Sequence, residues 1–148
     1  MIKDKKELMT LLSRERLQKE LQKLKQKLIE AGQAVGATDG DWHDGASFDQ
    51  AQRDFNLIQT QIEIIEEELK NVEIIKPNLA TDCIGIGHEV EVYDGESTKV
   101  FTILGPSDFD PVKSWVSFKS PIGESLLDCK KGDKIGKNTI VDFRPGKF

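Results

Sequence analysis

Apolar residues recur at spacings of three and four along two long stretches of the chain, and this periodicity limits the fold most strongly. The first stretch carries four leucines at these spacings, Leu17, Leu21, Leu24 and Leu28. The second carries eight apolar residues, Phe48, Ala51, Phe55, Ile58, Ile62, Ile65, Leu69 and Val72. Such spacing places side chains on one helix face and is typical of a coiled-coil seam. The pattern therefore predicts two long helices that pack along each other.

The ends of the two predicted helices are marked by glycine and proline. Residues 1–30 contain neither, whereas residues 32–45 contain four glycines among Ala, Thr and Asp. Glycine favours bends, so we expect a turn in residues 32–45, and Pro77 ends the second helix. The result is an antiparallel helical hairpin over residues 1–76, with arms of about 28 residues and a length of about 42 Å.

The two arms carry opposite charges. Residues 3–28 contain nine basic and four acidic residues, a net charge of +5, and residues 46–75 contain two basic and seven acidic residues, a net charge of -5. Opposite arms attract, whereas like helices of two chains repel, so we expect a monomer. The net charge of -5 for the whole chain therefore hides a basic arm and an acidic arm.

The second half of the chain has the period of β-strands. Residues 88–93 alternate polar and apolar side chains, Asp94-Gly95 is a turn signal, and residues 98–104, 114–119 and 139–143 follow as further strands. His88 is expected on the strand surface. Ser120-Pro121 opens a short helical turn, because proline suits a first helical position. The chain is therefore α+β, with a small antiparallel β domain over residues 77–148.

Length and composition exclude several classes of protein. A chain of 148 residues suits one ordinary domain or two small ones and rules out a large multidomain enzyme. Two cysteines, Cys83 and Cys129, do not make a disulfide framework, and we do not expect either of them to act as a nucleophile. No apolar run approaches 18 residues, so we expect no membrane span and a cytoplasmic protein with reduced thiols.

An acidic segment lies within the predicted turn of the hairpin. Residues 39–45 read Asp-Gly-Asp-Trp-His-Asp-Gly and contain three carboxylates and the imidazole of His43. Carboxylate oxygens suit Mg²⁺, Mn²⁺ or Ca²⁺. A calcium EF-hand does not fit, because Gln50 stands at the twelfth position where that loop needs Glu. The alternative is a solvated turn, in which Asp and Gly are common, although an exposed Trp42 is not expected from solvation alone.

Five segments together resemble the GreA/GreB family of bacterial transcript-cleavage factors. Met9-Thr10 and the leucine-rich residues 17–24 are similar to the opening helix of the family. Residues 40–48 match its pattern of Gly-Asp, two residues, an acid, one residue, Ala, one residue and an aromatic, which here is Phe48. Residues 116–122 and 131–133 resemble the late strand, Ser-Pro-Ile corner and Gly-Asp turn of its C-terminal domain. The resemblance covers nearly all of the chain.

The resemblance implies a function in which the protein is not itself an enzyme. The C-terminal domain would fold like an FKBP and dock on bacterial RNA polymerase, with Ser120, Pro121 and Ile122 as docking candidates. The hairpin would enter the secondary channel, where Asp41 and Asp44 would help to hold a Mg²⁺ ion shared with the polymerase. The polymerase would then cleave the 3′ end of backtracked RNA. Trp42 and Phe48 would support the tip, and the basic first helix would lie near the nascent RNA.

The tip departs from the family pattern at several positions. The second acid is Asp44 where Glu is usual, Trp42-His43 replaces an aliphatic-basic pair, and Gly45 replaces Asn. A carboxylate one methylene shorter reaches about 1.5 Å less far, and displacements near 1 Å can slow such sites about a hundredfold. A non-cleaving regulator or inhibitor that binds the same channel is therefore the second hypothesis. A coiled-coil adaptor unrelated to polymerase is the third, and it rests on the seam alone.

Overall fold

The computed structural model describes residues 6–39 and 45–148. They form two compact units, of which one comprises the chain up to Arg14 together with Val72–Phe148, and the other comprises Glu15–Asn71. The second unit is an excursion of the chain between two parts of the first. Within the described ranges, no helix is both long enough and apolar enough to cross a membrane.

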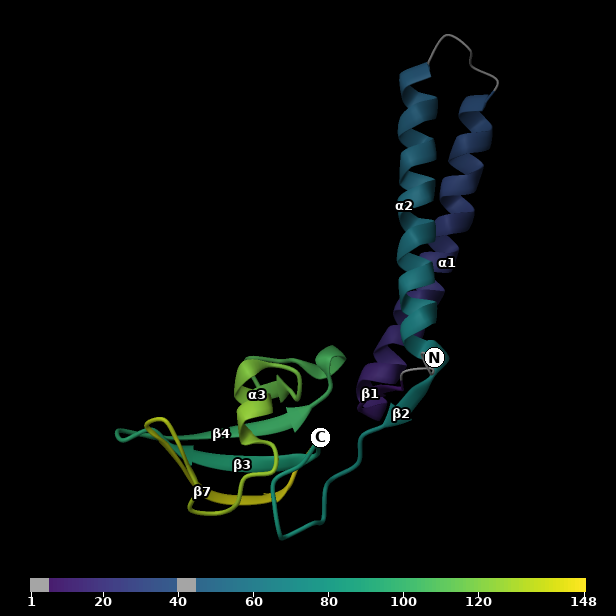
Figure 1. Cartoon of the computed structure of the whole chain (residues 1–148). Coiled ribbons are helices and arrows are strands. Elements are labelled where there is room, and N and C mark those ends of the chain that lie inside the picture. The colour runs from purple at the N-terminus through teal and green to yellow at the C-terminus, as the bar shows by residue number, and fades with distance from the viewer. Residues whose placement is uncertain (1–5, 40–44) are drawn as a thin grey trace, which may run out of the picture. The chain divides into compact units, whose positions relative to one another are not determined.

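The unit Glu15–Asn71 is a helical hairpin, as the apolar periodicity predicts. Helix α1 spans Leu11–Asp39 and helix α2 spans Gly45–Lys70, and the two lie side by side (Figure 1). The most buried side chains of this unit come from both predicted seams: Leu17, Leu24, Ile62 and Ile65. An exposed ion pair, with 3.7 Å between Lys25 Nζ and Glu66 Oε2, joins the basic arm to the acidic one. The hairpin and the α+β class are confirmed.

Helix α1 continues further than the glycine pattern indicates. The turn was expected from residue 32, but the helix runs through Gly32 and Gly36 to Asp39. A helical glycine costs about 1 kcal/mol relative to alanine, which a helix packed along a partner tolerates. At Gly32 an added Cβ would lie 3.5 Å from Cε2 of Phe55, so the two helices approach closely there. Packing between the arms thus outweighs the local preference for a bend.

Helix α2 ends earlier than expected, at Lys70. The residues Val72–Ile74 form strand β2, which pairs in parallel with strand β1, Glu7–Met9. The expectation of a helical Val72 was therefore wrong, because β-branched residues in this segment favour a strand once a partner strand is present. This pairing also explains why the first residues of the chain belong to the same unit as Val72–Phe148, whereas the sequence suggested a division at residues 76 and 77.

The C-terminal part contains a five-stranded sheet in the order β5-β4-β3-β7-β6. Strands β3 (His88–Tyr93), β4 (Thr98–Leu104), β6 (Lys134–Ile135) and β7 (Asn138–Pro145) pair antiparallel. Strand β5 (Trp115–Ser117) pairs with β4 in parallel, which differs from the expected antiparallel sheet. The 3₁₀ turn η1 (Pro106–Asp108) and the loop after it bring the chain back to the level of Thr102, so β5 runs parallel to the last three residues of β4.

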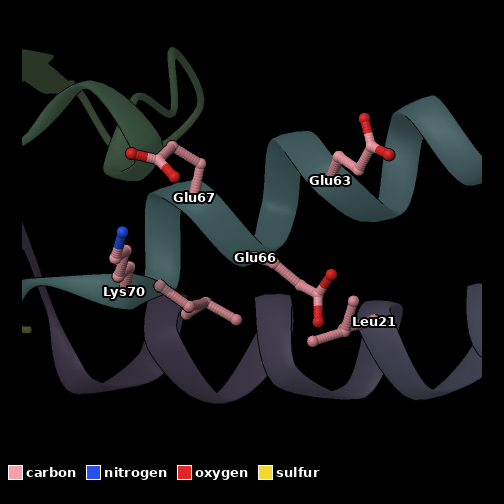
Figure 2. Close-up of a pocket in the computed structure, with 6 residues that line it drawn as sticks. Leu21, Glu63, Glu66, Glu67 and Lys70 are labelled. Carbon is pink, nitrogen blue, oxygen red and sulfur yellow. The ribbon is translucent and has the colours of Figure 1, made fainter.

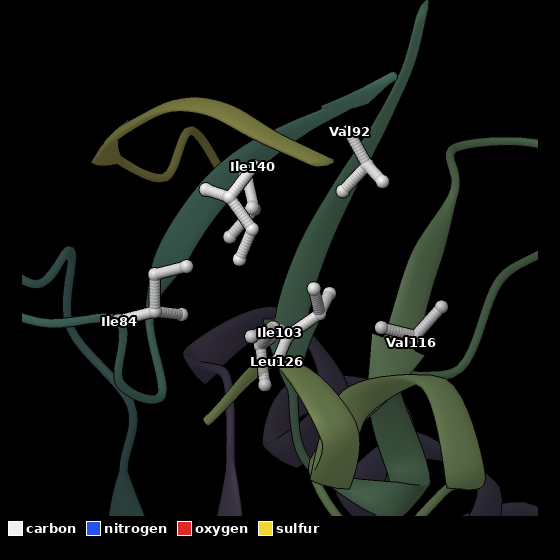
Figure 3. Packing of buried hydrophobic residues seen from close by; sticks show 7 residues of the cluster. Ile84, Val92, Ile103, Val116, Leu126 and Ile140 are labelled. Carbon is white, nitrogen blue, oxygen red and sulfur yellow. The ribbon is translucent and has the colours of Figure 1, made fainter. Parts of the chain in front are cut away.

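The core of this unit lies between the curved sheet and helix α3, Pro121–Leu126. Seven buried side chains form it, Ile84, Val90, Val92, Ile103, Val116, Leu126 and Ile140 (Figure 3). Alternate residues of β3 point inward, which is the periodicity that identified the strand. Burial of these side chains supplies the main stabilising term of a small sheet domain.

His88 is fully buried, so the expectation of a surface strand residue was wrong. Its Nδ1 accepts a hydrogen bond from the Gly85 amide at 2.9 Å, and its Nε2 lies 2.8 Å from the Ala80 carbonyl oxygen. The ring packs edge-on against Phe143, with 5.0 Å between centroids. Since His88 shares the inward face of β3 with Val90 and Val92, the alternation itself places it inside.

Candidate functional site

The acidic segment predicted as the metal site connects α1 to α2 in the sequence. Asp41, Trp42, His43 and Asp44 lie outside the described residues. Their roles as metal ligands and as tip support stay predictions. Among residues 6–39 and 45–148, no group of three or more His, Cys, Asp or Glu side chains is placed to hold a metal ion.

Phe48 lies in the first turn of α2 and is half-buried. It begins the row of apolar side chains that continues to Ile62 and Ile65. Seven residues further along α2, Phe55 meets Gly32 of α1. An aromatic row at this end of the hairpin is consistent with the predicted supporting role of Phe48, which itself stays a prediction.

The Ser-Pro-Ile corner forms the start of α3. The Ser120 hydroxyl donates a hydrogen bond to the Ser117 carbonyl at 2.6 Å and accepts one from the Gly123 amide at 3.1 Å. Ser120 is thus the N-cap of α3, and Pro121 occupies the first helical turn. Ile122 packs partly against the core, whereas Pro121 is exposed. Of the three docking candidates, Pro121 alone is exposed, while Ser120 and Ile122 shape the corner.

An open groove of about 510 Å³ lies along the hairpin, and three of its six lining residues are glutamates of α2 (Figure 2). Its lining residues are Leu21, Glu63, Glu66, Glu67, Leu69 and Lys70. In Figure 2, Glu66 points toward α1, where it pairs with Lys25. Glu63 and Glu67 extend from the same helix. The groove thus displays the negative charge that the sequence assigns to the second arm.

Sequence reasoning missed a polar network around Asp108, a residue that is 2% exposed. Its carboxylate accepts hydrogen bonds from the Thr10 amide and hydroxyl, from the Ser13 hydroxyl and from the Gly105 amide. Thr10 also caps α1, because its Oγ1 accepts from the Ser13 amide at 3.2 Å. The N-cap residue Thr10 was the available signal, but no local pattern links it to a residue 98 positions away.

Cys129 is not an activated nucleophile, in agreement with the sequence. Burial raises the pKa of its thiol, and the carboxylates of Asp133 and Asp128 raise it further. Its Sγ lies 3.3 Å from the Ser125 carbonyl oxygen, to which the thiol donates. A reactive cysteine needs a lowered pKa, so the raised pKa of Cys129 fits the expectation that this thiol is not a nucleophile.

A charged cluster links strands β3 and β7. The Arg144 guanidinium donates to Glu89 at 2.5 Å and to Glu91 at 2.6 Å. The hydrogen bond to Glu91, together with that to Glu89, raises the pKa of Arg144 above its usual value. Cross-strand pairs of this kind stabilise a sheet locally, and they account for these side chains without a ligand.

Comparison with known proteins covers both parts of the chain. Residues 7–74 match the family model described as "Transcription elongation factor, N-terminal", and residues 79–140 match "Transcription elongation factor, GreA/GreB, C-term". Among solved structures, GreA factor homolog 1 (Gfh1) of Thermus thermophilus is 21% identical, with 95% of this chain and 99% of that one covered and a TM-score of 0.46.

Curated relatives match over most of their length. Transcription elongation factor GreA of Desulfovibrio desulfuricans is 33% identical over 124 residues, which is 80% of this chain and 76% of the relative. GreA of Clostridium acetobutylicum is 31% identical over 144 residues, or 93% and 91% of the two chains. With both domain models matched and relatives of this identity aligned along most of its length, the chain belongs to the GreA/GreB family of transcription elongation factors.

Proposed function

We propose that this protein binds bacterial RNA polymerase in the cytoplasm and stimulates the polymerase's own cleavage of backtracked RNA at its 3′ end. One observation carries the proposal: in a chain that matches both family models, the segment between α1 and α2 contains Asp41 and Asp44, which the resemblance described above aligns with the acidic positions of the family. A long, narrow hairpin is the shape needed to bring two carboxylates into a channel too narrow for a globular domain.

The donor chemistry of the segment fits a shared Mg²⁺ ion. Asp41 and Asp44 offer hard carboxylate oxygens, which Mg²⁺ prefers, but two carboxylates do not complete its six-coordinate shell. The polymerase must therefore supply the remaining ligands, so the pair would not hold the ion stably alone. When bound, Mg²⁺ supplies charge stabilisation to the phosphate oxygens and lowers the pKa of its bound water.

Surfaces outside the acidic segment support the same proposal. Helix α1 carries a row of exposed basic residues at spacings of three and four, Arg16, Lys19, Lys23 and Lys27. Such a row lies on one helix face, and its positive charge suits the phosphates of nascent RNA. Exposed Pro121, at the corner that Ser120 caps, is the candidate docking contact. Among the described residues, both seams contribute buried side chains to the hairpin, Leu17 and Leu24 from α1 and Ile62 and Ile65 from α2, which favours a monomer in which the two arms pack on each other.

A non-cleaving regulator of the same channel is the second candidate function. The observation that favours it is Asp44, where the family usually has Glu, beside Trp42-His43 and Gly45. The shorter side chain would leave a carboxylate oxygen about 1.5 Å from its usual reach, enough to slow cleavage about a hundredfold.

Stalled, backtracked polymerase complexes with labelled RNA test both functions. We expect wild-type protein with Mg²⁺ to release 3′ fragments, and D41N and D44N to slow release by about a hundredfold. D49N is the matched control, because Asp49 is an exposed acid of α2 outside the acidic segment. Equal release by D41N and D49N contradicts the assignment of Asp41. Binding without fragments, with fragments restored by D44E, supports the regulator. No binding to core polymerase at low salt contradicts both functions.

A further inference from the structure

The buried carboxylate of Asp108 holds the start of helix α1 within the C-terminal unit. This is the unit that comprises the chain up to Arg14 together with Val72–Phe148. The Thr10 amide lies 3.1 Å from each of its oxygens, and the Thr10 hydroxyl lies 2.7 Å from Oδ1. The Ser13 hydroxyl also donates to Oδ1, and the Gly105 amide donates to Oδ2 at 3.1 Å. A carboxylate without water is stable only when donors surround it in this way.

The network acts on the helix end itself. One hydroxyl, that of Thr10, accepts from the Ser13 amide and donates to Asp108, so the cap of α1 is part of the link. The negative charge also lies at the N-terminal end of α1, where the helix dipole favours it. A second close contact adjoins it, since a Cβ on Gly105 would lie 1.9 Å from the Leu8 carbonyl oxygen. The chain on both sides of Met9 is thus held tightly to η1.

The helix that starts here continues without a break for 29 residues, from Leu11 to Asp39. A helix of that length extends about 43 Å, so a change of 10° in its direction moves its far end by about 7 Å. Helices of this length bend only gently unless a proline or a bulge interrupts them. Any restraint on the first turn is therefore amplified at the far end of the helix.

We propose that Asp108 is a positioning residue that restrains the direction in which α1 leaves the C-terminal unit. Resting on the proposed function, the same restraint controls where Asp41 and Asp44 arrive in the polymerase. Asp108 touches neither RNA nor metal in this account, and it acts through Thr10 and Ser13. Its effect is on the spread of helix directions, which a residue that merely stabilises the fold would not alter.

Spin labels measure this spread directly. Cys83 and Cys129 are first replaced by serine. Spin labels are then attached through Gln22→Cys and Glu96→Cys, at one exposed residue in each unit. The measurement gives the distribution of distances between the two labels. We expect a narrow distribution for the wild-type Asp108 and a broader one for D108N, whose amide keeps the size of the carboxylate but offers a single acceptor oxygen and adds donors. An unchanged width in folded D108N overturns the proposal.

Matched variants separate restraint from stability. T10V removes the hydroxyl that joins Asp108 to the helix cap and should broaden the distribution, whereas T10S keeps that hydroxyl and should not. V92A destabilises the same unit through its core, at a residue that makes none of the hydrogen bonds of the network, and should leave the width unchanged. All variants are measured at a temperature where circular dichroism shows them folded. Equal widths for T10V and T10S contradict the role of the hydroxyl.

Cleavage kinetics test the functional half separately. For D108N we expect the maximal rate at saturating protein to fall about tenfold, because displacements near 1 Å are costly in such sites. The half-saturating concentration should change little, since Pro121 is untouched. A maximal rate equal to that of V92A overturns the positioning role in cleavage. If wild-type protein releases no fragments, the proposed function fails, and the distance distributions alone decide whether Asp108 restrains α1.

Discussion

A Cβ atom on Gly123 would lie 2.0 Å from the carbonyl oxygen of Ser117. Helix α3 therefore lies so close to strand β5 that its third residue must be glycine. The Gly123 amide is also the donor that Ser120 caps, so the close approach and the cap depend on one residue. The corner with the exposed Pro121 is shaped by this contact.

Gly123→Ala should destabilise the C-terminal unit by about 2 kcal/mol or more, because the backbone oxygen of Ser117 cannot move aside cheaply. Urea unfolding followed by tryptophan fluorescence measures the loss. Gly36→Ala is the matched control, since nothing lies within 4 Å of its added Cβ and alanine is the better helix former, by about 1 kcal/mol. Destabilisation by Gly36→Ala equal to that by Gly123→Ala would contradict the steric explanation.

His88 should carry its proton on Nε2. The Gly85 amide can only donate, so Nδ1 must be the unprotonated nitrogen, and Nε2–H then donates to Ala80. Long-range proton–nitrogen correlation spectra distinguish the two tautomers. Observation of the Nδ1–H tautomer for His88 would contradict this arrangement.

His88→Ala should cost about 3 kcal/mol, because it removes two buried hydrogen bonds and leaves a cavity beside Phe143. Thermal unfolding measures the change. His43→Ala serves as the control because His43 is the other histidine of the chain and lies in the acidic segment. We expect His43→Ala to leave the unfolding temperature unchanged.

Cys129 should react slowly with thiol reagents near neutral pH. Burial and then the neighbouring Asp133 and Asp128 raise its pKa, so the thiolate forms at higher pH than in an unfolded chain. In a Cys83→Ser variant, the pH midpoint of alkylation should exceed that of cysteine in a short peptide. Asp133→Asn should lower the midpoint only in part, because burial is the larger cause. A midpoint at the peptide value would contradict the explanation.

The same shift has a consequence for stability. Because the folded-state pKa of Cys129 is raised, the thiol contributes stability to the folded protein. This contribution is fully present below the unfolded pKa and is lost as pH rises through the folded pKa. Stability should therefore fall on the alkaline side, and Cys129→Ser should reduce that fall. Urea unfolding at neutral and alkaline pH tests the difference between the two proteins.

Asp94 should show the opposite dependence. Backbone hydrogen bonds from Ser97 and Glu96 lower the pKa of its carboxyl, with amide-to-oxygen distances of 2.8 and 2.9 Å. A group whose folded-state pKa is lowered contributes stability to the fold. This contribution is present above the unfolded pKa and is lost as pH falls through the folded pKa. Asp94→Asn should therefore flatten the acid limb of the stability curve, and an unchanged limb would show that the hairpin turn does not depend on the charge.

The parts of the fold that were predictable are those with local periodicity. Leu17 and Ile62 lie buried in the hairpin because spacings of three and four place them on helix faces, and Val90 lies inside because strands alternate. Ser120 was found as a helix start because proline follows it. In each case the information lies within a few residues of the position concerned.

The parts that were missed depend on distant partners. Val72 continues the helical spacing, yet it pairs with Glu7 in a parallel ladder, and no local pattern reveals that partner. From the sequence alone, Asp108 is an acidic residue of a predicted loop. Only the structure shows that it accepts a hydrogen bond from Thr10. For the acidic segment, the sequence supplies the residues and the family pattern, and the structure describes the helix ends on either side of it.

The pairing of β1 with β2 makes the hairpin a domain inserted within another. During synthesis, the residues of α1 and α2 are complete once Lys70 has emerged. The hydrogen bonds between Thr10 and Asp108 can form only later, because Asp108 is translated much later. The inserted hairpin can therefore fold first as a local unit, and the host domain, which needs both Thr10 and Asp108, folds afterwards. The insertion also leaves hairpin length free to vary by whole helical turns, since both ends of the excursion return to the same host.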